Sequence, residues 1–277
     1  MYWSLFFTFT FRTVNRYVNT RKVTMFIDIN CDLGETDPAA GPGNDEALMP
    51  FITSASIACG FHAGDPLTIE RTVRSAMRHG VSIGAHPGYP DRQNFGRKAM
   101  SLSHDELRAM ILYQAGAVKA ITEAAGARMR HVKPHGALYN TAVKDYAVSA
   151  VIARAVRDLN PSLILVGQSG SEMIRAARDA GLACASEAFA DRAYDDDGAL
   201  VARNIEGAVL HDTDLMIRRV IRMIREKVVE TVSGKLIPIE ADTVCIHGDN
   251  ETAPEFVKKL AEALRAEGIT LRSLGME

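Results

Sequence analysis

The sequence predicts an α/β protein, a distorted TIM-like (β/α)7-8 barrel. From residue 25 onward, short β-rich runs alternate with helical periods, which indicates parallel strands joined by crossover helices. The candidate strands carry small or polar residues on one face and apolar residues on the other. An open sheet covered by helices on both sides would be apolar on both faces. A barrel instead places its site at the carboxyl ends of its strands, where the charged residues gather.

Eight runs predict the strands in order along the chain, the last more weakly than the others. In the first run Asp28, Asn30 and Asp32 share one face, because residues two apart on a strand point the same way. The runs are Phe26–Asn30, Ser54–Cys59, Val81–His86, Arg130–Pro134, Leu163–Gly167, Ala183–Phe189, Val244–His247 and Thr270–Leu274.

Helix start and stop signals lie between these runs. Asp65 followed by Pro66 is typical of an N-cap and first helical position, and Gly80 marks the end of that helix. Capping boxes are predicted at Ser103 to Glu106 and at Thr252 to Glu255.

Apolar periodicity predicts two more helices. One is a single helix from Thr141 to Leu159 that ends before Pro161, and the other begins at Asp212.

Composition narrows the class of protein. The chain has 277 residues, 47% hydrophobic and 24% charged, which suits one globular α/β domain over residues 25–277. Its net charge of −2 gives no reason to expect nucleic-acid binding. No apolar run approaches the ~20 residues that span a bilayer, so we expect no membrane role. The four cysteines show no paired spacing, which favours a reducing cytoplasm.

Residues 1–24 differ from the rest of the chain. They are rich in aromatic residues and carry Arg12, Arg16, Arg21 and Lys22 without a single acid. The basic residues follow the apolar stretch, which is the reverse of a signal peptide. We expect this segment to be a disordered extension or a mis-assigned start, with Met25 as the natural beginning.

Polar side chains at the strand ends would converge on one mouth of a closed barrel. Glu35 belongs to this group, although the pattern assigns it no role. The catalytic candidates are Asp32, His62, Asp65, Lys133, His135 and His247. The candidates for substrate binding are Asn30, His86, Arg92, Glu187, Asp191, Arg192 and Asp249.

Each candidate has a structural alternative. Lys133 lies on the small-residue face of its strand, where an unpaired ammonium is costly, so it needs an anionic neighbour or ligand. The glycines around His62 allow close backbone approach. Asp65 is equally well explained as a helix cap, and His86 as a structural residue before a turn. The loop around Arg92 is either an anion clamp or an ordinary solvated surface.

A metal site is a less favoured alternative. Asp28, Asp32, His62 and His86 offer the nitrogen and oxygen ligands that a divalent transition ion takes. The sequence has no H-E-x-x-H motif, however, and Asp/His clusters also transfer protons without metal. Glycine-rich phosphate loops are absent too, so side chains and helix N-termini would have to hold a nucleotide.

Six blocks are similar, in order, to the signature blocks of one family. The chain resembles the 5-oxoprolinase A-subunit family, also called LamB/YcsF-like proteins, from about Met25 to Leu274. The resemblance implies a barrel related to the glycoside hydrolase/deacetylase superfamily. The blocks are Ile27–Glu35, Ala58–Pro66, Gly84–Arg92, His131–Asn140, Glu187–Arg192 and Cys245–Asn250.

The resemblance also implies a role beside subunits B and C in an enzyme that hydrolyses 5-oxo-L-proline (pyroglutamate) to L-glutamate, using ATP with Mg²⁺. An unstrained lactam is a poor electrophile, and phosphorylating its oxygen creates a leaving group. On this hypothesis Lys133 and Arg92 hold anionic oxygens, and the candidate histidines transfer protons. Asp32 and Asp65 would polarise water or orient a histidine.

Two other functions stay open. The first is a metal-dependent hydrolase of the deacetylase kind that acts alone on N-acyl sugars. The second is a non-catalytic subunit that binds 5-oxoproline for its partners. One sequence cannot show how an active site is divided among subunits.

Overall fold

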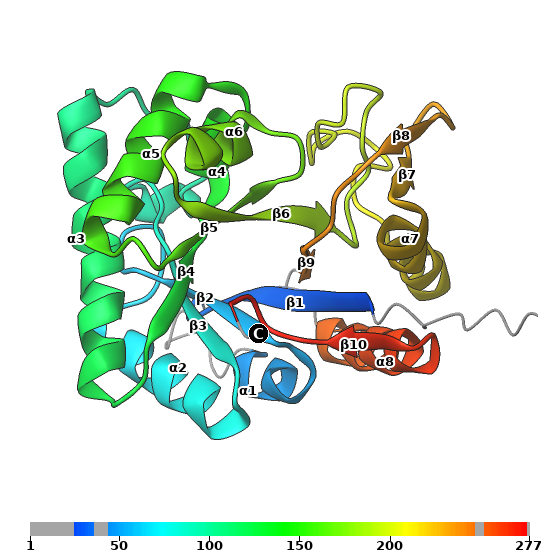
Figure 1. The fold of residues 1–277 in the computed structure, drawn as a ribbon, viewed down its shortest axis with the longest axis horizontal. Helices are drawn as coiled ribbons and strands as arrows, with labels where there is room; N and C mark the ends of the chain where they lie inside the picture. Colours follow the sequence, from blue (N-terminus) through cyan, green and yellow to red (C-terminus); the bar gives the residue numbers. More distant parts are fainter. Residues whose placement is uncertain (1–24, 36–43, 247–251, 276–277) are drawn as a thin grey trace, which may run out of the picture.

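The computed structural model describes residues 25–35, 44–246 and 252–275. Seven parallel strands form a closed barrel surrounded by helices (Figure 1). Successive strands pair in chain order, and β9 pairs with β1 to close the ring. The strands are β1 Met25–Leu33, β2 Ser54–Ala58, β3 Ser82–His86, β4 Met129–Val132, β5 Ile164–Gln168, β6 Ala183–Phe189 and β9 Thr243–Ile246. The predicted α/β barrel is confirmed, with seven strands in the ring.

Strand β1 is the longest and joins the two ends of the barrel sheet. Its first residues pair with β10 (Ile269–Leu271), with Met25 opposite Ile269. Its later residues pair with β9 and β2, and Asn30 lies opposite Ser54. The weak eighth run is therefore a strand, but it extends the sheet beside the ring instead of completing it.

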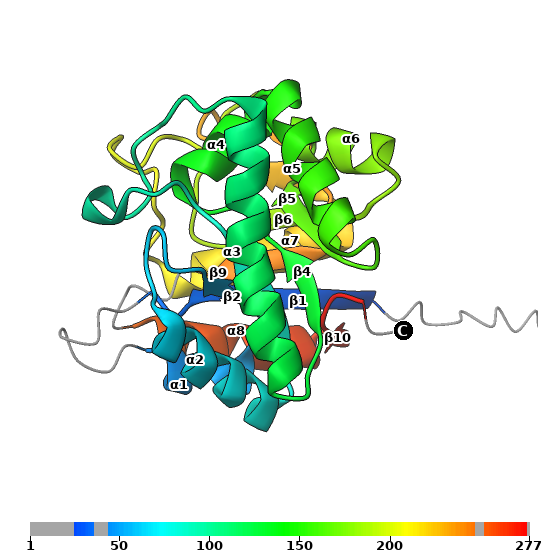
Figure 2. The ribbon, with the colours of Figure 1, turned by 90° about the vertical axis from the view of Figure 1, so that its left-hand side faces the viewer.

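The helices lie outside the barrel, and α3 packs along α5 (Figure 2). Their bounds are α1 Asp45–Leu48, α2 Pro66–His79, α3 His104–Ala124, α4 Gly136–Lys144, α5 Tyr146–Leu159, α6 Glu172–Asp179, α7 Thr213–Glu226 and α8 Ala253–Ala266. Short 3₁₀ turns cover Met49–Phe51 and Arg92–Asn94. Buried apolar residues fill the space between strands and helices.

Several helix predictions are confirmed in detail. Gly80 ends α2 in the left-handed conformation, and Ser103 with Glu106 forms a complete capping box. Thr252, in contrast, makes no side-chain cap hydrogen bond.

The single helix predicted from Thr141 to Leu159 is wrong. Asp145 has φ −112° and ψ 106°, which ends α4. Its carboxylate then accepts hydrogen bonds from the backbone N–H groups of Ala147 and Val148 and starts α5. Asp145 therefore separates two helices, although the apolar residues keep their helical spacing on both sides of it. That continuous spacing is why the sequence predicted a single helix.

A small hairpin lies outside the barrel and is absent from the prediction. Strands β7 (Val228–Glu230) and β8 (Leu236–Pro238) pair antiparallel between α7 and β9. Each strand has three residues, which are too few to show the alternation of apolar and polar residues that predicts a strand. In the part of the chain that the structure describes, no helix is both long and apolar enough to cross a membrane.

Candidate active site

A cavity of about 450 Å³ lies at the carboxyl ends of the barrel strands. Its lining contains two groups of ionisable side chains. The first group consists of Asp32, Glu35, His86, Lys133, His135 and Glu187. The second group, from loops and helix α4, consists of Arg97, Lys144, Arg192 and Arg203. One cavity thus presents both acid/base groups and anion-binding cations.

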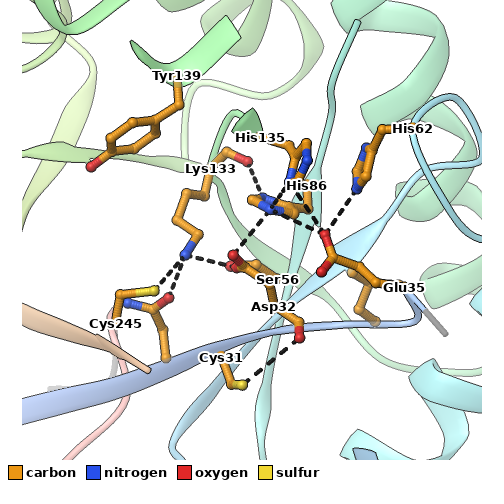
Figure 3. Close-up of polar contacts among 12 residues, drawn as sticks. Cys31, Asp32, Glu35, Ser56, His62, His86, Lys133, His135, Tyr139 and Cys245 are labelled. Carbon is orange, nitrogen blue, oxygen red and sulfur yellow. Dashed lines mark hydrogen bonds and ion pairs between the residues drawn. The ribbon is translucent and has the colours of Figure 1, made fainter. Parts of the chain in front are cut away.

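Lys133 is buried just after β4 among oxygen atoms (Figure 3). Its Nζ lies 2.7 Å from Asp32 Oδ1 and 3.0 Å from Glu187 Oε1, and it donates to Asn30 Oδ1 at 2.7 Å. Burial acts to lower the pKa of Lys133, but the charges of the two carboxylates outweigh it and raise that pKa well above its usual value. The anionic partner that a buried lysine requires is supplied by the protein itself.

Glu187 is fully buried in β6 and has a partner at each oxygen. Asn30 Nδ2 donates to Oε1 at 3.0 Å, and the Tyr139 hydroxyl donates to Oε2 at 2.6 Å. Burial and the charge of Glu187 raise the pKa of Tyr139 well above its usual value, so the phenol keeps its proton. The buried carboxylate is therefore held in one orientation.

Three histidines surround Glu35. Glu35 Oε1 lies 3.0 Å from His62 Nε2, 3.2 Å from His135 Nδ1 and 3.7 Å from His86 Nε2. Burial acts to raise the pKa of Glu35, but its contacts with the ring nitrogens of His135 and His62 lower it to about 2. Asp32 Oδ2 joins the group at 3.2 Å from His86 Nε2.

The environments of two of these histidines differ. Burial lowers the pKa of His62 to about 4, so this ring is neutral at neutral pH. Burial acts in the same direction on His86, but the charge of Asp32 outweighs it and raises the pKa of His86. The charge of His86, with that of Lys133, in turn holds the pKa of Asp32 well below its usual range despite burial.

Two glycines fix the position of the stacked rings of His62 and His135, whose centroids are 3.7 Å apart. A Cβ at Gly88 would lie 2.8 Å from His62 Nδ1, and one at Gly96 would lie 2.8 Å from His135 Cδ2. Gly96 also has φ +65°, a conformation that favours glycine. The loop backbone therefore contacts the rings directly.

His131 lies deeper inside the barrel, as expected for a core histidine. It is fully buried, and its Nε2 is 3.3 Å from Ser56 Oγ. A Cβ at Gly84 would lie 2.1 Å from that nitrogen, so the ring occupies the space that this glycine leaves. Burial lowers the pKa of His131 to about 3.

The metal ligand set predicted from sequence is brought together only in part: His62 and His86 belong to one cluster and Asp32 Oδ2 lies 3.2 Å from His86 Nε2, whereas Asp28 lies apart. Asp28 is buried below the cavity, where the hydroxyl groups of Thr53 and Ser54 each donate to Oδ1 at 2.6 Å and Thr243 donates to Oδ2. These partners occupy the carboxylate oxygens. Within the described ranges, the residues whose ligand atoms lie within 4.8 Å of one another are Glu35, His62, His86 and His135.

Two further candidates have structural roles. Asp65 caps α2, accepting from the Thr68 hydroxyl and from the backbone N–H groups of Thr68 and Leu67, and this hydrogen bonding lowers its pKa. Arg92 is exposed and donates to the carbonyls of Gly60 and Gly64, away from the cavity lining. Arg92 therefore holds its loop in place through these carbonyls and does not reach the cavity as an anion clamp would. Arg97, from the same loop, lines the cavity.

Arg192 is buried and lines the cavity. Its Nη2 donates to the Val201 carbonyl at 2.6 Å, while Nε has no hydrogen-bond partner among the described residues. Burial and the neighbouring charge of Arg203 lower the pKa of Arg192. Asp191 does not line the cavity, and His247 and Asp249 lie outside the described residues.

Sequence reasoning gave no role to Glu35, Tyr139 or Arg203, and it considered Arg97 only as part of the loop around Arg92. Glu35 comes shortly after the end of β1, which is a usable signal, whereas Tyr139 lies within helix α4. Arg203 lies in the long segment between β6 and α7, and no local pattern distinguishes it from other surface arginines.

The fold and the site define an α/β barrel protein whose ionisable residues gather in a pocket at the strand ends, the usual place for the active site of a barrel enzyme. The sequence profile of the LamB/YcsF family matches residues 27–277, so the chain belongs to the LamB/YcsF family.

Relatives support this assignment. The 5-oxoprolinase A-subunit of Geobacillus kaustophilus is 52% identical over 247 residues, covering 89% of this chain and 96% of that protein. The 5-oxoprolinase A-subunit of Acinetobacter baumannii (strain ACICU) is 50% identical over 248 residues, covering 90% and 98%. The name of these relatives indicates that they belong to a multi-subunit assembly.

Solved structures agree with the fold. The lactam utilization protein from Thermus thermophilus has a TM-score of 0.85 at 43% identity, covering 90% of this chain and 100% of that one. A putative cellobiose-phosphate cleavage protein from Enterococcus faecalis V583 has a TM-score of 0.53 at 16% identity, covering 90% and 97%, and shares the fold alone.

Proposed function

We propose that this chain is the component of a cytoplasmic, ATP-dependent 5-oxoprolinase that binds 5-oxo-L-proline and opens its ring to give L-glutamate. Family membership and the curated relatives support the component role. The observation that carries the proposal is the cavity itself, where a buried arginine and a cluster of carboxylates and histidines line the same small space. 5-Oxoproline has two matching parts, a carboxylate and a lactam.

Arg192 and Arg203 are the groups that bind the substrate carboxylate in this proposal. Arginine's forked donors suit a carboxylate, and the buried Nε of Arg192 has a donor to offer. This orientation points the lactam toward Lys133 and the histidines. A positioned cation stabilises negative charge that develops on an oxygen, and Lys133 is such a cation.

Proton transfer falls to the histidine cluster. Ring opening requires a proton for the lactam nitrogen and removal of one from water. His86 and His135 line the cavity, whereas His62 lies behind them and contacts Glu35. We therefore assign proton transfer to the part of the cluster where His86 and His135 face the cavity beside Asp32, acting directly or through a water molecule held there.

ATP with Mg²⁺ supplies, when bound, the phosphoryl group that makes the lactam oxygen a leaving group. Of this chain's residues, Arg97 and Lys144 would hold phosphoryl oxygens, since they line the cavity and carry the required charge. Subunits B and C complete the assembly in this proposal.

Glutamate release tests the function directly. The purified chain is assayed with and without subunits B and C, each with and without ATP and Mg²⁺. Glutamate should form only when all components are present. Arg192→Leu should raise KM for 5-oxoproline by ~10- to 100-fold, the value of a charge-assisted hydrogen bond. The matched control is Arg175→Leu, a surface residue paired with Glu172. Glutamate formed without ATP would overturn the proposal.

A further inference from the structure

Hydrogen bonds to backbone carbonyls determine which ring nitrogen carries the hydrogen in two histidines of the cavity. His86 Nδ1 lies 2.7 Å from the Lys133 carbonyl oxygen, and His135 Nε2 lies 2.8 Å from the Phe95 carbonyl oxygen. A carbonyl oxygen can only accept, so each of these nitrogens carries the hydrogen. In the neutral rings, His86 Nε2 and His135 Nδ1 therefore present lone pairs.

These two lone-pair nitrogens face each other at 3.0 Å. The Glu35 carboxylate oxygen lies 3.2 Å from His135 Nδ1 and 3.7 Å from His86 Nε2. A second carboxylate oxygen, Asp32 Oδ2, lies 3.2 Å from His86 Nε2. Electron-rich atoms gathered in this way repel one another unless a positive centre lies among them.

A proton satisfies this arrangement only in part. If His86 Nε2 carried a proton, that single N–H could point well at one of its three acceptor neighbours, because hydrogen bonds weaken steeply when bent. A metal ion, in contrast, is attracted to several lone pairs at once. Two histidines that donate their other N–H to backbone carbonyls are also what metal-ligating histidines show.

We propose that His86 Nε2, His135 Nδ1 and Glu35 Oε1 bind a single divalent transition-metal ion of the Zn²⁺ kind. Ligand bonds of ~2.0–2.1 Å in a tetrahedron separate the ligand atoms by ~3.4 Å. The three separations here, 3.0, 3.2 and 3.7 Å, bracket that value. Two imidazoles and one carboxylate form a donor set that suits such an ion.

His62 is a positioning residue for this site. Its ring N–H donates to Glu35 Oε1 at 3.0 Å, and it stacks parallel to His135. The three ligands line the cavity and His62 does not, so the fourth coordination position faces the substrate space. Three protein ligands with one open position are typical of catalytic metal sites, not of structural ones.

Metal binding by the full-length chain tests the inference without ATP, substrate or partner subunits, so its failure is distinct from failure of the proposed function. The chain is stripped with a chelator, dialysed and titrated with Zn²⁺ by calorimetry, and separately with Co²⁺ by visible absorption. A single equivalent should bind, and Co²⁺ should give the intense absorption of a tetrahedral site.

Variants locate the site. His135→Ala and Glu35→Gln should lose stoichiometric binding, while His62→Ala should weaken it by ~10- to 100-fold, as loss of a ligand-orienting partner does. The control is His211→Ala, which removes an exposed histidine. Circular dichroism checks that each variant folds, and X-ray absorption of the loaded wild-type chain should show two imidazoles without recourse to variants. No binding by the wild-type chain, or equal binding after His135→Ala, would overturn the proposal.

Discussion

Replacing Lys133 by methionine tests how the centre of the cavity is held together. Methionine keeps much of the side-chain volume and removes the ammonium. Asp32 and Glu187, with side chains 14% and 0% exposed, then lose the cation at 2.7 and 3.0 Å. The variant therefore leaves two buried carboxylates without their shared partner.

The expected loss follows from these contacts. At an effective dielectric constant of ~20, each ion pair at this distance is worth ~5–6 kcal/mol before desolvation is subtracted. Much of that attraction offsets the cost of burying the charges. Removing one partner of a buried pair costs ~3–5 kcal/mol, so we expect Lys133→Met to lower the free energy of unfolding by at least this amount. For a chain of this size that corresponds to a Tm lower by ~6–20 °C.

Urea denaturation followed by circular dichroism measures the loss. The matched control is Lys119→Met, which removes a lysine from a partly exposed surface pair with Glu123 on α3 and should cost ~0.5 kcal/mol or less. Adding Glu187→Gln to Lys133→Met should recover part of the stability, because one of the stranded charges is then removed. A loss under ~1 kcal/mol for Lys133→Met would refute this account of the buried pairs.

Three other predictions follow from the fold. Gly84→Ala should destabilise the protein by ~1–3 kcal/mol in chemical denaturation, because its Cβ meets His131, and should cost much less in a His131→Ala background. Burial lowers the pKa of His131 from 6.5 to about 3, so the unfolded state binds a proton at His131 more readily than the folded state does. The contribution of the neutral His131 to the free energy of unfolding is therefore fully present above pH 6.5 and is lost as the pH falls toward 3. His131→Leu should lack that part of the pH dependence in unfolding measured across the range, and unchanged slopes would contradict it. Asp65→Ala should cost ~1 kcal/mol and Asp65→Ser much less, since serine also caps helices. Turnover lost in the stable serine variant would instead assign Asp65 to the chemistry.

The architecture was predictable because its signals are local and repeated. Alternation along the strands placed Asn30 and Lys133 on the inner face, and their contact across the barrel follows from closure. Burial of Lys133 similarly required an acid nearby, although the sequence could not say which one.

The parts that could not be predicted depend on loop geometry. Glu35 reaches the histidines after Gly34, whose φ of +72° turns the chain at the end of β1. Arg92 and Arg97 lie in one loop, yet Arg92 donates hydrogen bonds to backbone carbonyls and Arg97 lines the cavity. Such a difference is set by contacts between distant segments, which no periodicity in one segment encodes.

Gly88 and Gly96 have a consequence for how mutational scans of this protein should be designed. Scans that search for functional positions usually remove chemistry by shortening side chains to alanine. At these two positions alanine adds atoms, and the added methyl group would displace the imidazole rings. The most disruptive replacements near the site are thus expected at positions where the wild-type residue has no side chain. A mutant library that omits glycines would miss the two positions that hold the rings of His62 and His135 in place.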